Sequence, residues 1–90
     1  MPKFIIEREI SGVGDSTSEQ LADISRKSCG VLNEMDRGIQ WIQSYVTPDK
    51  IYCVYLAKDE QQLLDHATQG GFPANTIARV KEIIEPVTAE

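Results

Sequence analysis

The sequence lacks long hydrophobic runs, clustered basic residues and any abundance of cysteine or histidine. Its longest apolar stretch is far below the ~20 residues of a membrane-spanning helix. Lysine and arginine do not cluster, so we expect neither nucleic acid nor a membrane as a partner. The two cysteines, Cys29 and Cys53, are too few for a disulfide framework. We therefore expect a cytoplasmic protein whose thiols are reduced, and buried rather than bridged.

Ninety residues with a formal charge of −5 and a pI of about 4.8 fit one acidic domain over residues 1–90. The N-terminus turns acidic at Glu7, which is too early for a secretory signal. A chain this short buries only ~60–65% of its unfolded surface, so its core is thin. Sharing a face with a second copy would enlarge that core, and we expect a homodimer.

The N-terminal third predicts a strand followed by one long helix. Residues 3–10 are rich in β-branched side chains and contain no breaker, which favours a strand. Thr17 and Gln20 have the spacing of a capping box, which predicts a helix over about 18–36 with Gly38 as its stop. The strand carries Phe4, Ile6, Arg8 and Ile10 on one face and Ile5, Glu7 and Glu9 on the other. The apolar stripe of the helix comprises Leu21, Ile24, Ser28, Val31, Leu32 and Met35.

Two further strands, residues 39–46 and 51–56, flank a turn centred on Pro48 and Asp49. This turn pairs Val46 with Ile51 and fixes two hairpin faces, neither of which is polar. Helices of so short a chain can cover one face only, so a second subunit is the simplest cover for the other. One face comprises Trp41, Gln43, Tyr45, Tyr52, Val54 and Leu56, and the other comprises Ile42, Ser44, Val46, Ile51, Cys53 and Tyr55.

The C-terminal third predicts a second helix and a last strand. Asp59 caps a helix over 60–69, with Leu63, Leu64 and Ala67 facing inward, and Gly70-Gly71 ends it. Residues 77–87 also have helical spacing, but we expect a strand near 80–84 with Pro86 at an edge.

The predicted order β-α-β-β-α-β is the ferredoxin-like topology of the α+β class. It places the first and third strands at the centre of an antiparallel sheet with both helices on one face. Two such sheets packed together would give a dimeric assembly resembling an α+β barrel.

Several motifs together resemble a known family. They are Gln40-Trp41, Ser44-Tyr45-Val46, Lys50-x-Tyr52-Cys53-x-Tyr55, the Thr-Ala-Glu tail and, most specifically, His66-x-x-x-Gly70-Gly71-Phe72-Pro73-Ala74. The chain resembles the domain-of-unknown-function family 4242, small ferredoxin-like proteins that include a nickel-binding protein. The resemblance implies a homodimer with its sheets face to face and Ni²⁺ binding at the dimer surface. The sequence departs from the nickel-binding members at Phe72, where they carry a histidine.

Four residues are the candidate metal ligands: His66, Glu7, Glu9 and Cys53. A neutral imidazole suits nickel or a similar divalent ion, and the two carboxylates point the same way ~7 Å apart along their strand. Each residue also has a structural interpretation. His66 would cap helix carbonyls, the carboxylates would be solvated or salt-bridged, and the cysteines, Cys29 included, would be small buried hydrophobes.

The aromatic residues of the hairpin are dense enough to line a pocket for a planar ligand. Its candidate residues are Trp41, Tyr45 and Tyr55, together with Phe72, and His66 would serve as an acid or base. Core and interface packing is the competing interpretation. No pattern of a nucleophile elbow is present, and we identify no catalytic residue.

The sequence thus predicts a small homodimeric binding protein for nickel or another divalent metal, and we favour binding over catalysis. One alternative is a small-molecule enzyme or binder of the dimeric α+β barrel type. The other is an interaction module without catalysis.

Overall fold

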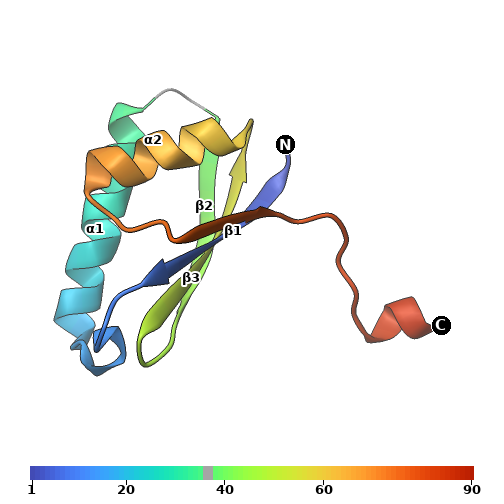
Figure 1. Cartoon of the computed structure of the whole chain (residues 1–90), viewed down its shortest axis with the longest axis horizontal. Coiled ribbons are helices and arrows are strands. Elements are labelled where there is room, and N and C mark those ends of the chain that lie inside the picture. Colours follow the sequence, from blue (N-terminus) through green and yellow to red (C-terminus); the bar gives the residue numbers. More distant parts are fainter. Residues whose placement is uncertain (36–37) are drawn as a thin grey trace.

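The computed structural model describes residues 1–35 and 38–90. Its element order confirms the predicted β-α-β-β-α-β topology (Figure 1). The strands are β1 (Lys3–Glu9), β2 (Ile39–Val46), β3 (Lys50–Ala57) and β4 (Thr76–Arg79). The α-helices are α1 (Ser18–Glu34) and α2 (Glu60–Gly70), and two short 3-10 helices are η1 (Val13–Asp15) and η2 (Pro86–Ala89).

The strands form one antiparallel sheet in the order β2-β3-β1-β4, with the first and third strands central as predicted. Both α-helices lie on one face of it, which we call the inner face (Figure 1). Strand β3 alternates strictly between this face and the other. Its buried, inner-face side chains are Ile51, Cys53, Tyr55 and Ala57. In the described part of the chain, no helix covers the opposite face, which we call the outer face (Figure 1).

The register of the β2–β3 hairpin is confirmed near its turn, where Val46 pairs with Ile51. A bulge further along β2 changes the faces, because Trp41 pairs with Tyr55 while Gln43 pairs with the adjacent Val54. The extra residue, Ile42, is 43% exposed. Our assignment of Trp41 to the same face as Tyr45 was therefore wrong, since one inserted residue reverses the alternation on one side of it.

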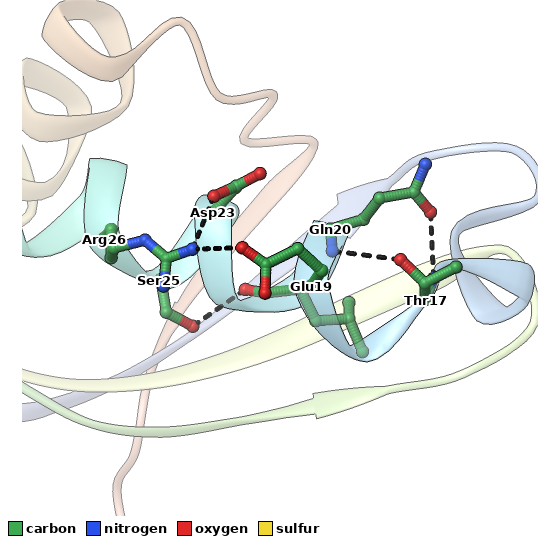
Figure 2. Close-up of polar contacts among 7 residues, drawn as sticks. Thr17, Glu19, Gln20, Asp23, Ser25 and Arg26 are labelled. Atoms are coloured by element: carbon green, nitrogen blue, oxygen red, sulfur yellow. Dashed lines mark hydrogen bonds and ion pairs between the residues drawn. The ribbon is translucent and has the colours of Figure 1, made fainter.

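Helix α1 begins with the predicted capping box (Figure 2). The Thr17 hydroxyl accepts from the Gln20 amide at 3.1 Å, and the Gln20 side chain accepts from the Thr17 amide at 2.8 Å. These two bonds satisfy amide groups that the first helical turn leaves free. The helix ends at Glu34, because Met35 is extended, so Gly38 is not its C′ residue. The remainder of the predicted helix, residue 36, lies outside the described residues.

Helix α2 is capped by Asp59, whose carboxylate accepts from the Gln62 amide at 3.1 Å. It ends at Gly70, followed by Gly71 in a left-handed conformation with φ of 69°. Leu64 was predicted to face inward but is 40% exposed. Successive residues of an α-helix are about 100° apart around its axis. The side that faces the core therefore contains residues three or four positions apart, such as Leu63 and His66, and not Leu64. The buried residues of α2 are Leu63, His66, Ala67 and Gly70.

The last strand is β4, Thr76–Arg79, and not the predicted 80–84. Pairing with β1 starts after residues 71–74, where the Asn75 amide donates to the Glu7 carbonyl at 3.0 Å. It ends when the Val80 amide donates to Lys3, the first residue of β1. Beyond this point no β1 residue remains to pair. The helical alternative for 77–87 is also wrong, and Pro86 begins η2 instead of lying on an edge strand.

One apolar cluster forms the core between the inner face and the helices. Cys53 belongs to it, whereas Cys29 is exposed, contrary to prediction, because its neighbour Ser28 is the α1 residue that faces the core. Both thiols are free, as predicted. In the described residues, no helix is both long and apolar enough to span a bilayer.

Candidate ligand-binding site

A cavity of about 140 Å³ lies between α1 and the inner face of the sheet. We call it the α1 cavity. Strands β1, β2 and β3 supply its floor, α1 supplies its roof, and the segment after α2 closes one side. Its walls are mainly apolar, and the largest apolar side chains are Ile10, Leu21, Ile24, Trp41, Ile51 and Phe72.

The cavity exists because α1 does not fill the space beneath it. Of the residues of α1, Ser28 alone is buried, at 6% exposure, and Leu21 and Ile24 stay partly exposed. Ser25 of α1 and Ser44 of β2 also line the cavity. Serine side chains are small, so facing serines leave volume where leucines would interlock. Leu21, Ile24 and Ser28 of the predicted apolar stripe therefore line a hollow.

Arg8 of β1 is the charged residue of the cavity wall and is only 3% exposed. Its Nη1 donates to the Pro73 carbonyl at 2.6 Å, and its Nε donates to the Cys53 sulfur at 3.4 Å. Its Nη2 is buried without a hydrogen-bond partner. Across residues 1–35 and 38–90, no carboxylate lies within ion-pair distance of this guanidinium. The interior thus holds a positive charge with no counter-charge in the described chain.

His66 of α2 is fully buried beside this charge. Its Nε2 lies 3.3 Å from the Ser28 hydroxyl and 3.3 Å from the Tyr55 hydroxyl. The side chain points into the interior, so the expected role of capping helix carbonyls is wrong. Burial, and secondarily the Arg8 charge, lowers the pKa of His66 from its usual 6.5 to about 4. The imidazole is therefore neutral near pH 7, and His66 is not among the residues of the cavity wall.

Phe72 closes the cavity next to Arg8. Its ring centre lies 5.4 Å from the Arg8 guanidinium carbon and 5.7 Å from the His66 ring centre. Gly70 makes this position available, because a Cβ atom at Gly70 would sit 2.2 Å from the Phe72 ring. The double glycine of the sequence thus ends α2 and also lets the chain fold Phe72 back over the site.

The four candidate metal ligands do not come together in one copy of the chain. Glu7 lies on the outer face, where its carboxylate pairs with Lys50 at 2.5 Å, and Glu9 on the same face accepts from Asn75 at 3.4 Å. Cys53 and His66 are buried on the inner side. Among the described residues, no group of three or more His, Cys, Asp or Glu side chains could hold a metal ion. A cation in the interior would also face the Arg8 charge.

Of the four candidate pocket residues, the structure brings three together. Trp41, Tyr55 and Phe72 line the α1 cavity. The fourth, Tyr45, is 54% exposed and lies on the outer face opposite Tyr52. Sequence reasoning missed Arg8 as a site residue. Its position in the alternation, on the same face as Phe4 and Ile6, was the signal that it would be buried.

Comparison with known proteins identifies the family. A family model described as nickel responsive protein SCO4226-like matches residues 4–80. The fold is similar to the crystal structure of SCO4226 from Streptomyces coelicolor A3(2), with a TM-score of 0.76 and 19% sequence identity. That similarity covers 91% of this chain and 99% of that chain. No curated protein matches the chain. The resemblance drawn from the motifs is confirmed: the chain belongs to the family of nickel responsive SCO4226-like proteins.

Proposed function

We propose that this protein binds a small organic molecule, about the size of one aromatic ring, in the α1 cavity. The observation that carries the proposal is a largely apolar hollow of about 140 Å³ beneath a helix that buries little else. An apolar cavity of ~150 Å³ in another protein accepts benzene. The indole of Trp41 and the ring of Phe72 would contact such a ligand.

Binding, not catalysis, is the activity that these walls support. Their polar groups are chiefly hydroxyls and one guanidinium, which can orient a ligand by hydrogen bonds. His66, the acid or base that the sequence suggested, is not a residue of the cavity wall, and its pKa of about 4 makes it a weak base near pH 7. The partly exposed Leu21 and Ile24 mark the side from which a ligand would enter.

The fluorescence of Trp41, the single tryptophan, tests this proposal directly. We expect saturable changes when benzamide or benzoate is titrated into the protein. Ser25→Leu would fill the cavity and remove the response, whereas Asn33→Leu, on the exposed side of the same helix, would retain it. An unresponsive wild type, or an undiminished response in Ser25→Leu, would overturn the proposal.

We propose that the functional unit is a homodimer formed through the outer face. Two features support this assembly. The outer face exposes Ile5 by 40% and Tyr45 by 54%. The C-terminal segment 81–90 is entirely exposed and leads away from the sheet (Figure 1), with Ile83 and Ile84 exposed by 60% and 83%. Exposed apolar groups in such numbers are typical of an interface.

Light scattering at micromolar concentration tests the homodimer. We expect a mass twice that of the chain, which is 10.1 kDa. Removal of residues 81–90 should weaken the dimer. Leu64→Ser, an exposed apolar change on α2, is the control and should leave it intact. A monomeric wild type would refute the assembly.

We also propose a divalent metal site for Ni²⁺ at the dimer surface, and the family description supports it. The donors would be Glu7 and Glu9 from each copy, because they lie on the outer face, whereas His66 and Cys53 are buried away from it. Titration of Ni²⁺ should give binding that Glu9→Gln weakens and His66→Gln spares. Absence of binding, or binding unchanged in Glu9→Gln, would remove this site.

A cytoplasmic location is our proposal for the compartment. Cys29 is a free and exposed thiol, and such thiols persist in reducing compartments. Fractionation of cells that produce the native chain would test it, and recovery outside the cytoplasm would contradict it.

A further inference from the structure

We infer that the ligand of the α1 cavity is an anion, a single-ring molecule bearing a carboxylate or similar group that pairs with Arg8. This inference rests on the proposed function and specifies its ligand class. It starts from the guanidinium, whose Nη2 is buried without a partner while Nε and Nη1 are engaged.

The two engaged nitrogens hold the guanidinium in place. The Pro73 carbonyl and the Cys53 sulfur come from the segment after α2 and from β3, so Arg8 is held from two directions. The Phe72 ring contacts the group as well, 5.4 Å from its central carbon. A fixed donor loses little freedom when it binds, which favours a specific partner over a diffuse ion atmosphere.

Buried charges in proteins are normally paired, because water cannot solvate them. The groups around the Arg8 guanidinium are a neutral carbonyl, a thiol, an aromatic ring and the hydroxyl of Tyr55, and none of them carries a full negative charge. The residues that line the cavity include no aspartate or glutamate, even though the whole chain is acidic at −5. A carboxylate ligand would supply the negative charge that the cavity wall lacks.

Hydroxyl groups also line the cavity: Ser28 lies on its roof, and Tyr55 lies on its floor with Arg8. Burial raises the pKa of Tyr55, so its hydroxyl stays protonated and able to donate. A guanidinium with neighbouring hydroxyls is a donor set for carboxylate oxygens. The apolar walls around Trp41 and Ile24 would hold the ring. A metal cation is disfavoured at the same place by the Arg8 charge.

Benzoate, benzamide and acetate distinguish the parts of the inference. Benzoate and benzamide have nearly the same shape and differ in charge, whereas acetate carries the charge without the ring. We expect the wild type to bind benzoate at least ~10-fold more tightly than benzamide, because hydrogen bonds between charged partners are the stronger ones. Acetate should bind more weakly than benzoate. Trp41 fluorescence, with calorimetry as a second readout, gives the dissociation constants.

Arg8→Met removes the charge and keeps much of the side-chain volume. In this variant the preference for benzoate should disappear while benzamide affinity is retained. Arg26→Met, on the exposed face of α1, should leave both affinities unchanged. If Arg8→Met does not fold, the affinities of Arg8→Lys and of the wild type for benzoate and benzamide test the pairing with Arg8.

The outcomes separate this inference from the proposed function. Equal binding of benzoate and benzamide would overturn the anion while leaving a ring-binding cavity. Acetate binding as tightly as benzoate would overturn the ring. Binding of none of the three would overturn the inference and the proposed function together.

Discussion

Two arginines on opposite sides of α1 have opposite surroundings. Arg26 lies on the exposed face of the helix, where its Nη2 pairs with Glu19 at 2.8 Å and with Asp23 at 2.7 Å (Figure 2). Arg8 lies beneath the helix, 3% exposed, and has no carboxylate partner in the described chain. The exposed guanidinium of Arg26, which water solvates, thus has two carboxylate partners. The buried guanidinium of Arg8 has none among the described residues.

We interpret the Arg26 charge as contributing to folding and the Arg8 charge as contributing to ligand binding. An exposed ion pair contributes only about 0–1 kcal/mol, so the Arg26 cluster is a modest aid to α1. A buried guanidinium without an anion destabilises the folded chain, and its retention needs a purpose other than stability. Recognition of an anionic ligand provides that purpose.

The largest expected effect comes from pH, because the interior responds to it at His66. The folded protein keeps His66 neutral down to about pH 4, whereas the unfolded chain takes up the proton near 6.5. The stabilisation is therefore complete above pH 6.5 and is lost as the pH falls toward 4, by at most about 3 kcal/mol. Urea unfolding at several pH values measures the slope.

Among the described residues, the charged and titratable groups around His66 include Arg8 from β1 and Tyr55 from β3. His66→Gln should flatten the wild-type slope between pH 4 and 6.5, because glutamine takes up no proton. Arg26→Met should leave the slope in place. An identical slope in wild type and His66→Gln would show that other groups govern the acid response.

The next effect contrasts two glycines: Gly70, at the end of α2 beside Phe72, and Gly30, in the interior of α1. Gly70→Ala places a Cβ atom against the Phe72 ring and should destabilise the protein by about 1–3 kcal/mol. Gly30→Ala meets no atom within 4 Å in the interior of α1 and should stabilise it by about 0.5–1 kcal/mol. Thermal unfolding of the two variants checks the pair. Equal effects would mean that Phe72 does not pack against Gly70.

The smallest effect contrasts the arginines themselves, in ligand-free protein. Arg8→Met should raise the free energy of unfolding by about 1–2 kcal/mol, because an unpaired buried charge is replaced by an apolar group. Arg26→Met should lower it by less than about 1 kcal/mol. Denaturant titration compares them. A larger loss in Arg8→Met than in Arg26→Met would show that the bond to Pro73 outweighs the cost of burying the charge.

Much of the fold could be predicted because local signals agree with it. The capping box at Thr17, the Asp59 cap and the turn after Val46 each depend on neighbours in sequence. The bulge at Ile42 could not be predicted, because an inserted residue leaves no mark on a strand that is apolar on both faces. The bounds of β4 depend on where β1 begins, which is a long-range contact.

The site was predictable in part for similar reasons. Trp41, Tyr55 and Phe72 could be proposed from aromatic density, which predicts burial without saying on which face. Arg8 looked like a surface residue by its chemistry, and only its alternation with Phe4 and Ile6 indicated burial. The orphaned Nη2 required the fold, since Pro73 and Cys53 are distant in sequence.

A crystal structure of the protein with benzoate tests the role of Arg8 most directly. We expect the benzoate ring in the α1 cavity beside Trp41 and a carboxylate oxygen ~2.7–2.9 Å from Arg8 Nη2, the usual distance for a charged pair. Benzoate bound away from Arg8, or Nη2 paired instead with an aspartate or glutamate of a second copy, would contradict this role.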